Sequence, residues 1–170
     1  MVGSTCLSEI NIDGYGGASM ANIVELTLTD ALVKALREER IVTIATTDFE
    51  KGVPNVSAIS WVYAMDEKVI RFAVDQRSRI VENLRHHAGL VLTVMANESI
   101  YSISGEAIIK AERIEGVPLK LTLIEVSVQE VRDVMFYGAK LAIEPKYEKT
   151  YDLRAAEKLD NQVSSAMKDA

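Results

Sequence analysis

Short runs of β-branched and aromatic residues recur along the chain from residue 41 to residue 131, and polar or glycine-containing turns separate most of them. Such runs predict strands, and the short connections favour hairpins over the long crossovers of a parallel sheet. The expected strands cover residues 41–47, 53–63, 69–74, 90–96, 100–111 and about 119–131. Five to six hairpin-linked strands with two inserted helices predict a mainly β protein, an antiparallel barrel rather than a parallel α/β sheet.

Two irregularities mark the last two expected strands. Gly105 interrupts the strand at 100–111, as a bulge or a bend would. In the last strand, the apolar side chains have one parity up to Leu123 and the other parity from Ile124 onward. This one-residue slip predicts either a bulge or a switch of the buried face.

Two segments before residue 90 show helical spacing. Thr29 can cap a first helix, whose apolar stripe contains Leu28, Leu32, Ala35 and Leu36. A second helix is expected at 78–88, with Ser78 as its N-cap and Gly89 as its C-terminal stop. Its apolar face consists of Ile80, Val81, Leu84 and Ala88.

Arg77 and Arg79 flank the N-terminus of this second helix, where the helix dipole disfavours cations by about 0.3–1 kcal/mol each. An anion there would be held by free backbone N–H groups, the Ser78 hydroxyl and the two guanidinium groups, and phosphate suits that arrangement best. The alternative is a solvated start to a surface helix, with Asp75 as the local counter-ion. The segment from Phe72 to Leu84 leaves both interpretations open.

Composition limits the class of protein. With 170 residues, 48% of them hydrophobic and 26% charged, the chain can form one globular domain with a substantial core. The net charge of −6 does not point to nucleic acid or to acidic membranes as partners. Cys6 is the only cysteine, which excludes an intrachain disulfide and a thiolate-cluster metal site. Since no secretory signal or membrane-spanning apolar run is evident, we expect a cytoplasmic protein.

The chain divides into three parts. Residues 1–20 have no periodic pattern, and we expect a leader that is disordered or vector-derived. Residues 21–144 are expected to form the barrel domain. Residues 145–170 are expected to form a helical tail, with helical spacing at Leu153, Ala156 and Leu159, that packs on the barrel edge or on a partner subunit.

Six short motifs follow one another at characteristic intervals. They are the first helix, Ile41-Val-Thr-Ile-Ala-Thr46, Lys51-Gly-Val-Pro54, Val56-Ser-Ala-Ile-Ser-Trp61, Phe72 to Leu84, and Ile103-Ser-Gly-Glu-Ala107. Their order, from about Ile23 to Phe136, resembles the pyridoxamine 5′-phosphate oxidase-like FMN-binding split-barrel family. The resemblance implies a split antiparallel β-barrel of about six strands with flanking helices, with FMN as its cofactor. It also implies a homodimer with the flavins at the subunit interface.

The resemblance assigns residues to the cofactor. The flavin phosphate would lie at the end of the third strand and the start of the second helix, at Val74, Asp75, Arg77, Ser78 and Arg79. The isoalloxazine ring would lie along the second strand, at Ser57, Ala58, Ile59 and Ser60. Tyr101 and Ser102 would approach the flavin from the other subunit. For the two serines of the second strand, a cross-strand hydrogen bond is an equal alternative, because buried hydroxyl groups need partners. Trp61 is expected in the core or at the dimer interface.

Two departures from the family pattern matter. Many members carry Lys after the Ser-Arg pair, where this chain has Ile80, and Arg77 would have to supply that charge although Arg and Lys do not hold phosphate identically. The true oxidase also completes its pyridoxal site with a C-terminal Arg and Trp. Nothing after Pro145 matches that segment, since Trp61 is the only tryptophan. We therefore do not expect oxidation of pyridoxamine phosphate.

The expected function is that of an FMN flavoprotein, an oxidoreductase between a reduced nicotinamide donor and a small organic acceptor. No side chain stands out as a general acid or base, so no catalytic residue is assigned. The alternatives are a non-catalytic flavin-binding or stress-related module, and haem or a deazaflavin in the same cleft. No metal site is expected, because the adjacent His86 and His87 point about 100° apart on a helix and cannot hold one ion together.

Overall fold

The structure is a computed structural model that describes residues 24–170. The elements are β1 (Val24–Glu25), α1 (Asp30–Ala35), β2 (Val42–Thr47), β3 (Pro54–Ile59), β4 (Val62–Ala64), β5 (Val69–Asp75), α2 (Arg79–His86), β6 (Gly89–Ala96), β7 (Ser99–Ala111), β8 (Leu121–Asp133) and α3 (Leu153–Asp169). The predicted leader at 1–20, with Cys6, lies outside the described residues.

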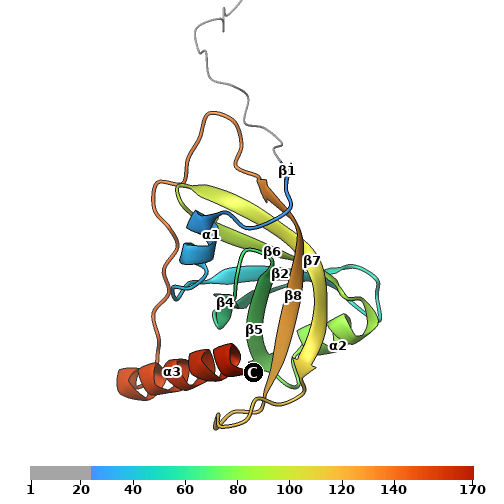
Figure 1. Cartoon of the computed structure of the whole chain (residues 1–170), viewed down its shortest axis with the longest axis vertical. Coiled ribbons are helices and arrows are strands. Elements are labelled where there is room, and N and C mark those ends of the chain that lie inside the picture. The colour runs from blue at the N-terminus through green and yellow to red at the C-terminus, as the bar shows by residue number, and fades with distance from the viewer. Residues whose placement is uncertain (1–23) are drawn as a thin grey trace, which may run out of the picture.

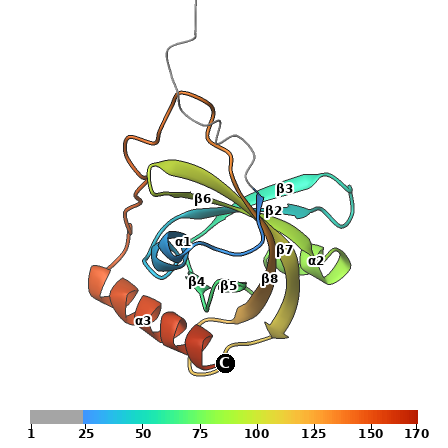
Figure 2. The same ribbon diagram turned by 45° about the horizontal axis from the view of Figure 1, so that its top comes forward.

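The strands form one curled antiparallel sheet in the order β3-β2-β6-β7-β8-β5-β4, and β1 pairs with β8. The curl surrounds α1, whereas α2 and α3 lie outside it (Figures 1 and 2). The predicted mainly β fold, a split barrel with flanking helices, is thus confirmed. There are more strands than the expected six because β1 was not predicted and one predicted strand is divided.

That predicted strand, at 53–63, is corrected by the structure. β3 pairs with β2 as far as Ile59, and the chain then turns, with the Val62 N–H donating to the Ser60 carbonyl oxygen at 3.0 Å. The carbonyl oxygen of Trp61 accepts a hydrogen bond from the Ala73 N–H at 3.0 Å, so the chain now follows β5. Because β3 and β4 are the two ends of the sheet order, this short turn joins both edges of the curled sheet.

Two groups of buried side chains hold the fold together, and β8 contributes to both. Ile124 and Val126 belong to the main core inside the curl, with α1 and the inward faces of the strands. Leu121 and Leu123 belong to a smaller cluster under α3. The parity change predicted in this strand therefore reflects two buried faces. The pairing of β7 with β8 also shifts register between Ile109 and Ala111, and again beside Gly105, where the interruption was predicted.

The predicted helix starts are confirmed. The Thr29 hydroxyl accepts a hydrogen bond from the Leu32 N–H at 3.3 Å, and the Ser78 hydroxyl accepts one from the Ile80 N–H at 3.2 Å. The second helix ends at His86, two residues before the predicted end, and Gly89 begins β6.

The C-terminal tail packs on the chain's own barrel, which is one of its two predicted positions. Residues 134–152 run from β8 along the outside of the barrel to α3 (Figure 1). α3 lies against β5 and buries Ala156, Val163 and Met167. Of the helices within 24–170, none combines the length and apolar character needed to cross a membrane.

Candidate functional site

A cavity of about 500 Å³ opens where the turn between the two sheet edges faces the end of β5 and the start of α2. It is lined by Ile41, Ser57, Ala58, Ile59, Ser60, Trp61, Ala73, Val74, Asp75, Ser78, Ile80 and Tyr147. The walls are mainly aliphatic, and serine hydroxyls, one carboxylate and one phenol supply the polar groups. A cavity with apolar walls and a few converging polar groups is the usual form of a small-molecule site.

Seven of the eleven predicted cofactor residues line this cavity together. Four come from β3 and the turn after it, and three come from the end of β5 and the cap of α2. They are Ser57, Ala58, Ile59, Ser60, Val74, Asp75 and Ser78. The two segments were predicted separately, and the fold brings them to the same cavity because the chain turns at Ser60 and follows β5. Their contact with a cofactor stays a prediction.

Arg77 lies beside the cavity without lining it. Its side chain is 91% exposed, and its Nε atom is 3.3 Å from the Asp75 Oδ1 atom. Its backbone N–H donates to the same oxygen at 2.8 Å. These two hydrogen bonds from Arg77 hold the pKa of Asp75 below its usual value. Asp75 is thus the counter-ion of Arg77, as the solvated alternative for this segment predicts, and a phosphate role for Arg77 stays a prediction.

Arg79 points away from the cavity, toward the turn between β2 and β3. Its Nε and Nη2 atoms contact the two carboxylate oxygens of Asp48 at 3.0 Å each, and Nη2 also contacts Glu50 at 2.6 Å. The guanidinium carbon lies 4.2 Å from the centre of the Phe49 ring. The hydrogen bonds from Arg79 are the main reason that the pKa of Asp48 falls to about 2. A phosphate role for Arg79 stays a prediction, and it would require the side chain to leave or share these carboxylates.

A buried polar side chain of α2 also fixes the β2–β3 turn. Asn83 is fully buried, and its side-chain nitrogen donates to the Thr46 hydroxyl at 2.8 Å. Its side-chain oxygen accepts a hydrogen bond from the Phe49 N–H at 3.1 Å. Together with Arg79, Asn83 ties the end of β2 and the β2–β3 turn to α2.

Tyr101 and Ser102 lie on β7, where they pair with Val94 and Thr93 of β6. They do not line the cavity of their own chain, which agrees with the predicted approach to the other subunit's flavin but does not test it. Burial raises the pKa of Tyr101, and the nearby Asp133 carboxylate adds to this effect.

Five lining residues were not among the predicted cofactor residues: Ile41, Trp61, Ala73, Ile80 and Tyr147. Trp61 lies partly against the smaller core cluster, and its Nε1–H donates to Asp160 of α3 at 2.8 Å. Tyr147 belongs to the segment between β8 and α3. Its position could not be inferred from local sequence pattern, because it depends on where the C-terminal tail docks.

Contacts within its own helix and with the β2–β3 turn hold the His86 ring. The Nδ1 atom of His86 lies 2.9 Å from the Glu82 carbonyl oxygen, and its ring stacks on Phe49 with 4.8 Å between ring centres. Within residues 24–170, no group of three or more His, Cys, Asp or Glu side chains could hold a metal ion.

Known proteins of similar sequence or structure identify the family. The family model described as pyridoxamine 5′-phosphate oxidase matches residues 28–135, which is more than half of the chain. A search of curated proteins gives no match.

Three solved structures illustrate the likeness. A candidate pyridoxamine 5′-phosphate oxidase from Lactobacillus delbrueckii has a TM-score of 0.52 and 15% identity, over 63% of this chain and 94% of that protein. The HupZ protein of Group A Streptococcus has a TM-score of 0.53 and 16% identity, over 66% and 98%. A heme binding protein from Mycobacterium smegmatis has a TM-score of 0.50 and 18% identity, over 65% and 54%. Identities this low establish a shared fold and nothing about ligands. With the family match, they show that this chain is a split-barrel member of the pyridoxamine 5′-phosphate oxidase family.

Proposed function

We propose that this protein binds FMN in the 500 Å³ cavity and acts as a cytoplasmic oxidoreductase between a reduced nicotinamide donor and a small organic acceptor. The observation that carries this proposal is the convergence on one cavity of two separate segments, one with Ser57–Ser60 and the other with Val74, Asp75 and Ser78. Both were assigned to the flavin from their resemblance to the family, and one of them also from the electrostatics of the α2 N-terminus.

The chemistry of the cavity walls suits a flavin nucleotide. Aliphatic side chains such as Ile41, Ile59 and Val74 provide apolar surface for a planar ring system. The hydroxyl groups of Ser57 and Ser60 and the peptide groups beside them can hydrogen-bond the polar edge of that ring. At the other end, Ser78 caps α2, whose N-terminus favours an anion, and Arg77 lies within reach of the rim.

When bound, FMN would supply the electron or hydride transfer chemistry itself. The residues of the chain would bind the phosphate, orient the ring and limit the access of water. None of the lining side chains is assigned a catalytic role.

We further propose that the active form is a homodimer with the flavin at the subunit interface, so that Tyr101 and Ser102 of one copy approach the cavity of the other. The exposed apolar side chain of Val56, 65% accessible on the edge strand β3, supports an interface near the cavity. No nucleic acid and no membrane is proposed as a partner.

The spectrum of the purified protein tests the cofactor. We expect a yellow preparation with the absorption bands of an oxidised flavin, and we expect NADH or NADPH to bleach these bands until an acceptor restores them. If NADH and NADPH do not bleach the flavin, or if no acceptor restores the bleached bands, the non-catalytic module is favoured. A Soret band would show that the bound cofactor is haem, and the spectrum of a deazaflavin would show that it is a deazaflavin, in place of FMN.

Replacing Arg79 with alanine tests the phosphate site. If the guanidinium holds the flavin phosphate, the Kd of FMN should rise about tenfold or more, because a charge-assisted contact is lost. The measurement is a titration of apoprotein with FMN followed by quenching of flavin fluorescence. Arg85→Ala is the matched control, since Arg85 lies on the same helix, is similarly exposed (38% against 37%) and is also paired with two carboxylates. If Arg79→Ala binds FMN as tightly as wild type, Arg79 is not a phosphate ligand.

A further inference from the structure

Tyr147 separates the candidate flavin cavity from two neighbouring cavities. Its side chain lines the 500 Å³ cavity and also a cavity of about 170 Å³ under α3. It lines a third cavity, of about 600 Å³, beside residues 145–149 and Arg40. The ring of Tyr147 is therefore a partition at which three spaces meet.

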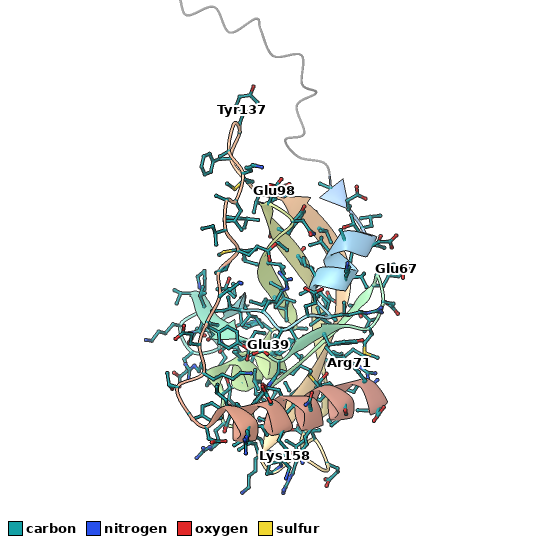
Figure 3. The ribbon with its side chains drawn as sticks, turned by 90° about the vertical axis from the view of Figure 1, so that its left-hand side faces the viewer. Glu39, Glu67, Arg71, Glu98, Tyr137 and Lys158 are labelled. Atoms are coloured by element: carbon teal, nitrogen blue, oxygen red, sulfur yellow. The ribbon has the colours of Figure 1, made fainter. Side chains whose placement is uncertain are left out.

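Hydrogen bonds hold this ring in place. The Tyr147 hydroxyl donates a hydrogen bond to the Glu39 carboxylate at 2.5 Å. Glu39 also forms a salt bridge with the Lys149 ammonium group at 2.8 Å. Burial, with the hydrogen bond to Glu39, raises the pKa of Tyr147 to about 12, so the hydroxyl stays protonated and able to donate at neutral pH. Figure 3 shows Glu39 between the barrel and α3, where the descending C-terminal segment passes it.

The segment that carries Tyr147 is fixed at its other side by α3. Lys149 pairs with Asp160 of α3, and Asp160 accepts a second hydrogen bond from the Trp61 Nε1–H at 2.8 Å. Trp61 itself lines the 500 Å³ cavity. Tyr147 and α3 lie beyond residues 28–135, the part of the chain that matches the family, whereas Glu39 and Trp61 lie within it.

We propose that Tyr147 determines the ligand specificity of the cavity: its ring limits the cavity to a ligand with a ring system of flavin size and excludes a larger planar macrocycle such as haem. This inference rests on the proposed FMN function. With the phenol ring removed, the 500 Å³ cavity would open into the two neighbouring cavities. The cavity under α3 shares Ser60 and Trp61 with the 500 Å³ cavity, so the added space lies next to the walls assigned to the flavin ring.

Binding of two probes, FMN and hemin, to three variants of the full chain tests this inference. Tyr147→Phe keeps the ring and removes the hydrogen bond to Glu39. Tyr147→Ala removes the ring. Tyr151→Ala is the control, because Tyr151 belongs to the same segment, is 53% exposed and lines none of these three cavities. Titrations give the Kd of each probe, and far-UV circular dichroism and thermal unfolding verify that each variant is folded.

We expect Tyr147→Ala to lower the ratio of the hemin Kd to the FMN Kd by about tenfold or more, through weaker FMN binding and tighter hemin binding. Tyr151→Ala should keep the wild-type ratio, and Tyr147→Phe should change it less than Tyr147→Ala does, because the ring is kept and only its hydrogen bond to Glu39 is lost. An unchanged ratio in Tyr147→Ala, while wild type binds FMN, would overturn the specificity role and leave the FMN function intact. If the wild-type protein binds no FMN, the proposed function is wrong. If Tyr147→Ala nevertheless binds hemin more tightly than wild type does, the role of Tyr147 in limiting the cavity still holds. If no variant binds either probe, both proposals fail.

Discussion

Gly105→Ala is expected to destabilise the protein by about 3 kcal/mol, at the upper end of the cost of overpacking. A Cβ atom at this position would lie 2.4 Å from the backbone carbonyl oxygen of Ser127 and 2.9 Å from the Val126 side chain. The closer of these atoms belongs to the backbone of the neighbouring strand and cannot rotate away. The extra methyl group would therefore push β7 and β8 apart at the place where their register already shifts.

Gly89→Ala is the matched control. Gly89 also lies in a strand, and a Cβ atom there would meet nothing within 4 Å. Urea unfolding followed by circular dichroism gives both free energies. We expect Gly89→Ala to change the free energy of unfolding by less than about 1 kcal/mol. Equal stabilities of the two variants would show that the β7–β8 pair can accommodate a side chain at Gly105.

The outline of the barrel was predictable because its strands and helices are encoded by local patterns. The two helix caps, Thr29 and Ser78, lie where the sequence predicts them, because capping depends on a side chain and a backbone N–H two or three residues away. The interruption at Gly105 was also predicted. Its cause, the approach of the Ser127 carbonyl oxygen, depends on another strand and was not visible in the sequence.

The division of the second predicted strand could not be predicted from local pattern. Residues 53–63 read as one continuous run, and the change of partner from β2 to β5 at Ser60 is a property of the curled sheet. That same turn forms the cavity. Seven of the eleven residues assigned to the site by resemblance therefore lie together, although the turn that brings them together was missed.

Long-range charge pairs were the least predictable part of the site. Arg79 was expected to face an anion, because its position at a helix N-terminus is unfavourable for a cation. In the structure Asp48 and Glu50 provide the negative charge, and neither residue was assigned to the site. Tyr147 was likewise placed in a tail of unknown position. Pairing across separate segments needs the folded geometry, which periodicity in one segment does not contain.

Arg71→Ala is expected to lower the free energy of unfolding by about 3 kcal/mol, because it breaks a buried network and leaves Lys110 as the remaining cation beside Glu125. The Arg71 side chain is 9% exposed, and its Nε atom lies 2.8 Å from the Glu125 carboxylate. Its Nη1 atom donates to the Met167 carbonyl oxygen at 2.8 Å, in the last turn of α3. Figure 3 shows Arg71 between the barrel and this helix. Arg71 thus neutralises a carboxylate on β8 and satisfies the C-terminus of α3 at the same time.

Loss of this contact should release α3 before the barrel unfolds, and Trp61 should report the release. Trp61 is the only tryptophan, and its indole N–H is bonded to Asp160 of α3, so its fluorescence should change at a lower urea concentration than the β-sheet signal in circular dichroism. Arg154→Ala, at an exposed arginine of α3, is the control and should leave both transitions in place. Arg71→Met combined with Glu125→Gln should recover part of the loss, because it also removes the carboxylate that Arg71 neutralised, while Lys110 is 31% exposed and can be hydrated instead. Coincident, unshifted transitions in Arg71→Ala would mean that apolar contacts alone, through Val163 and Met167, hold α3 on the barrel.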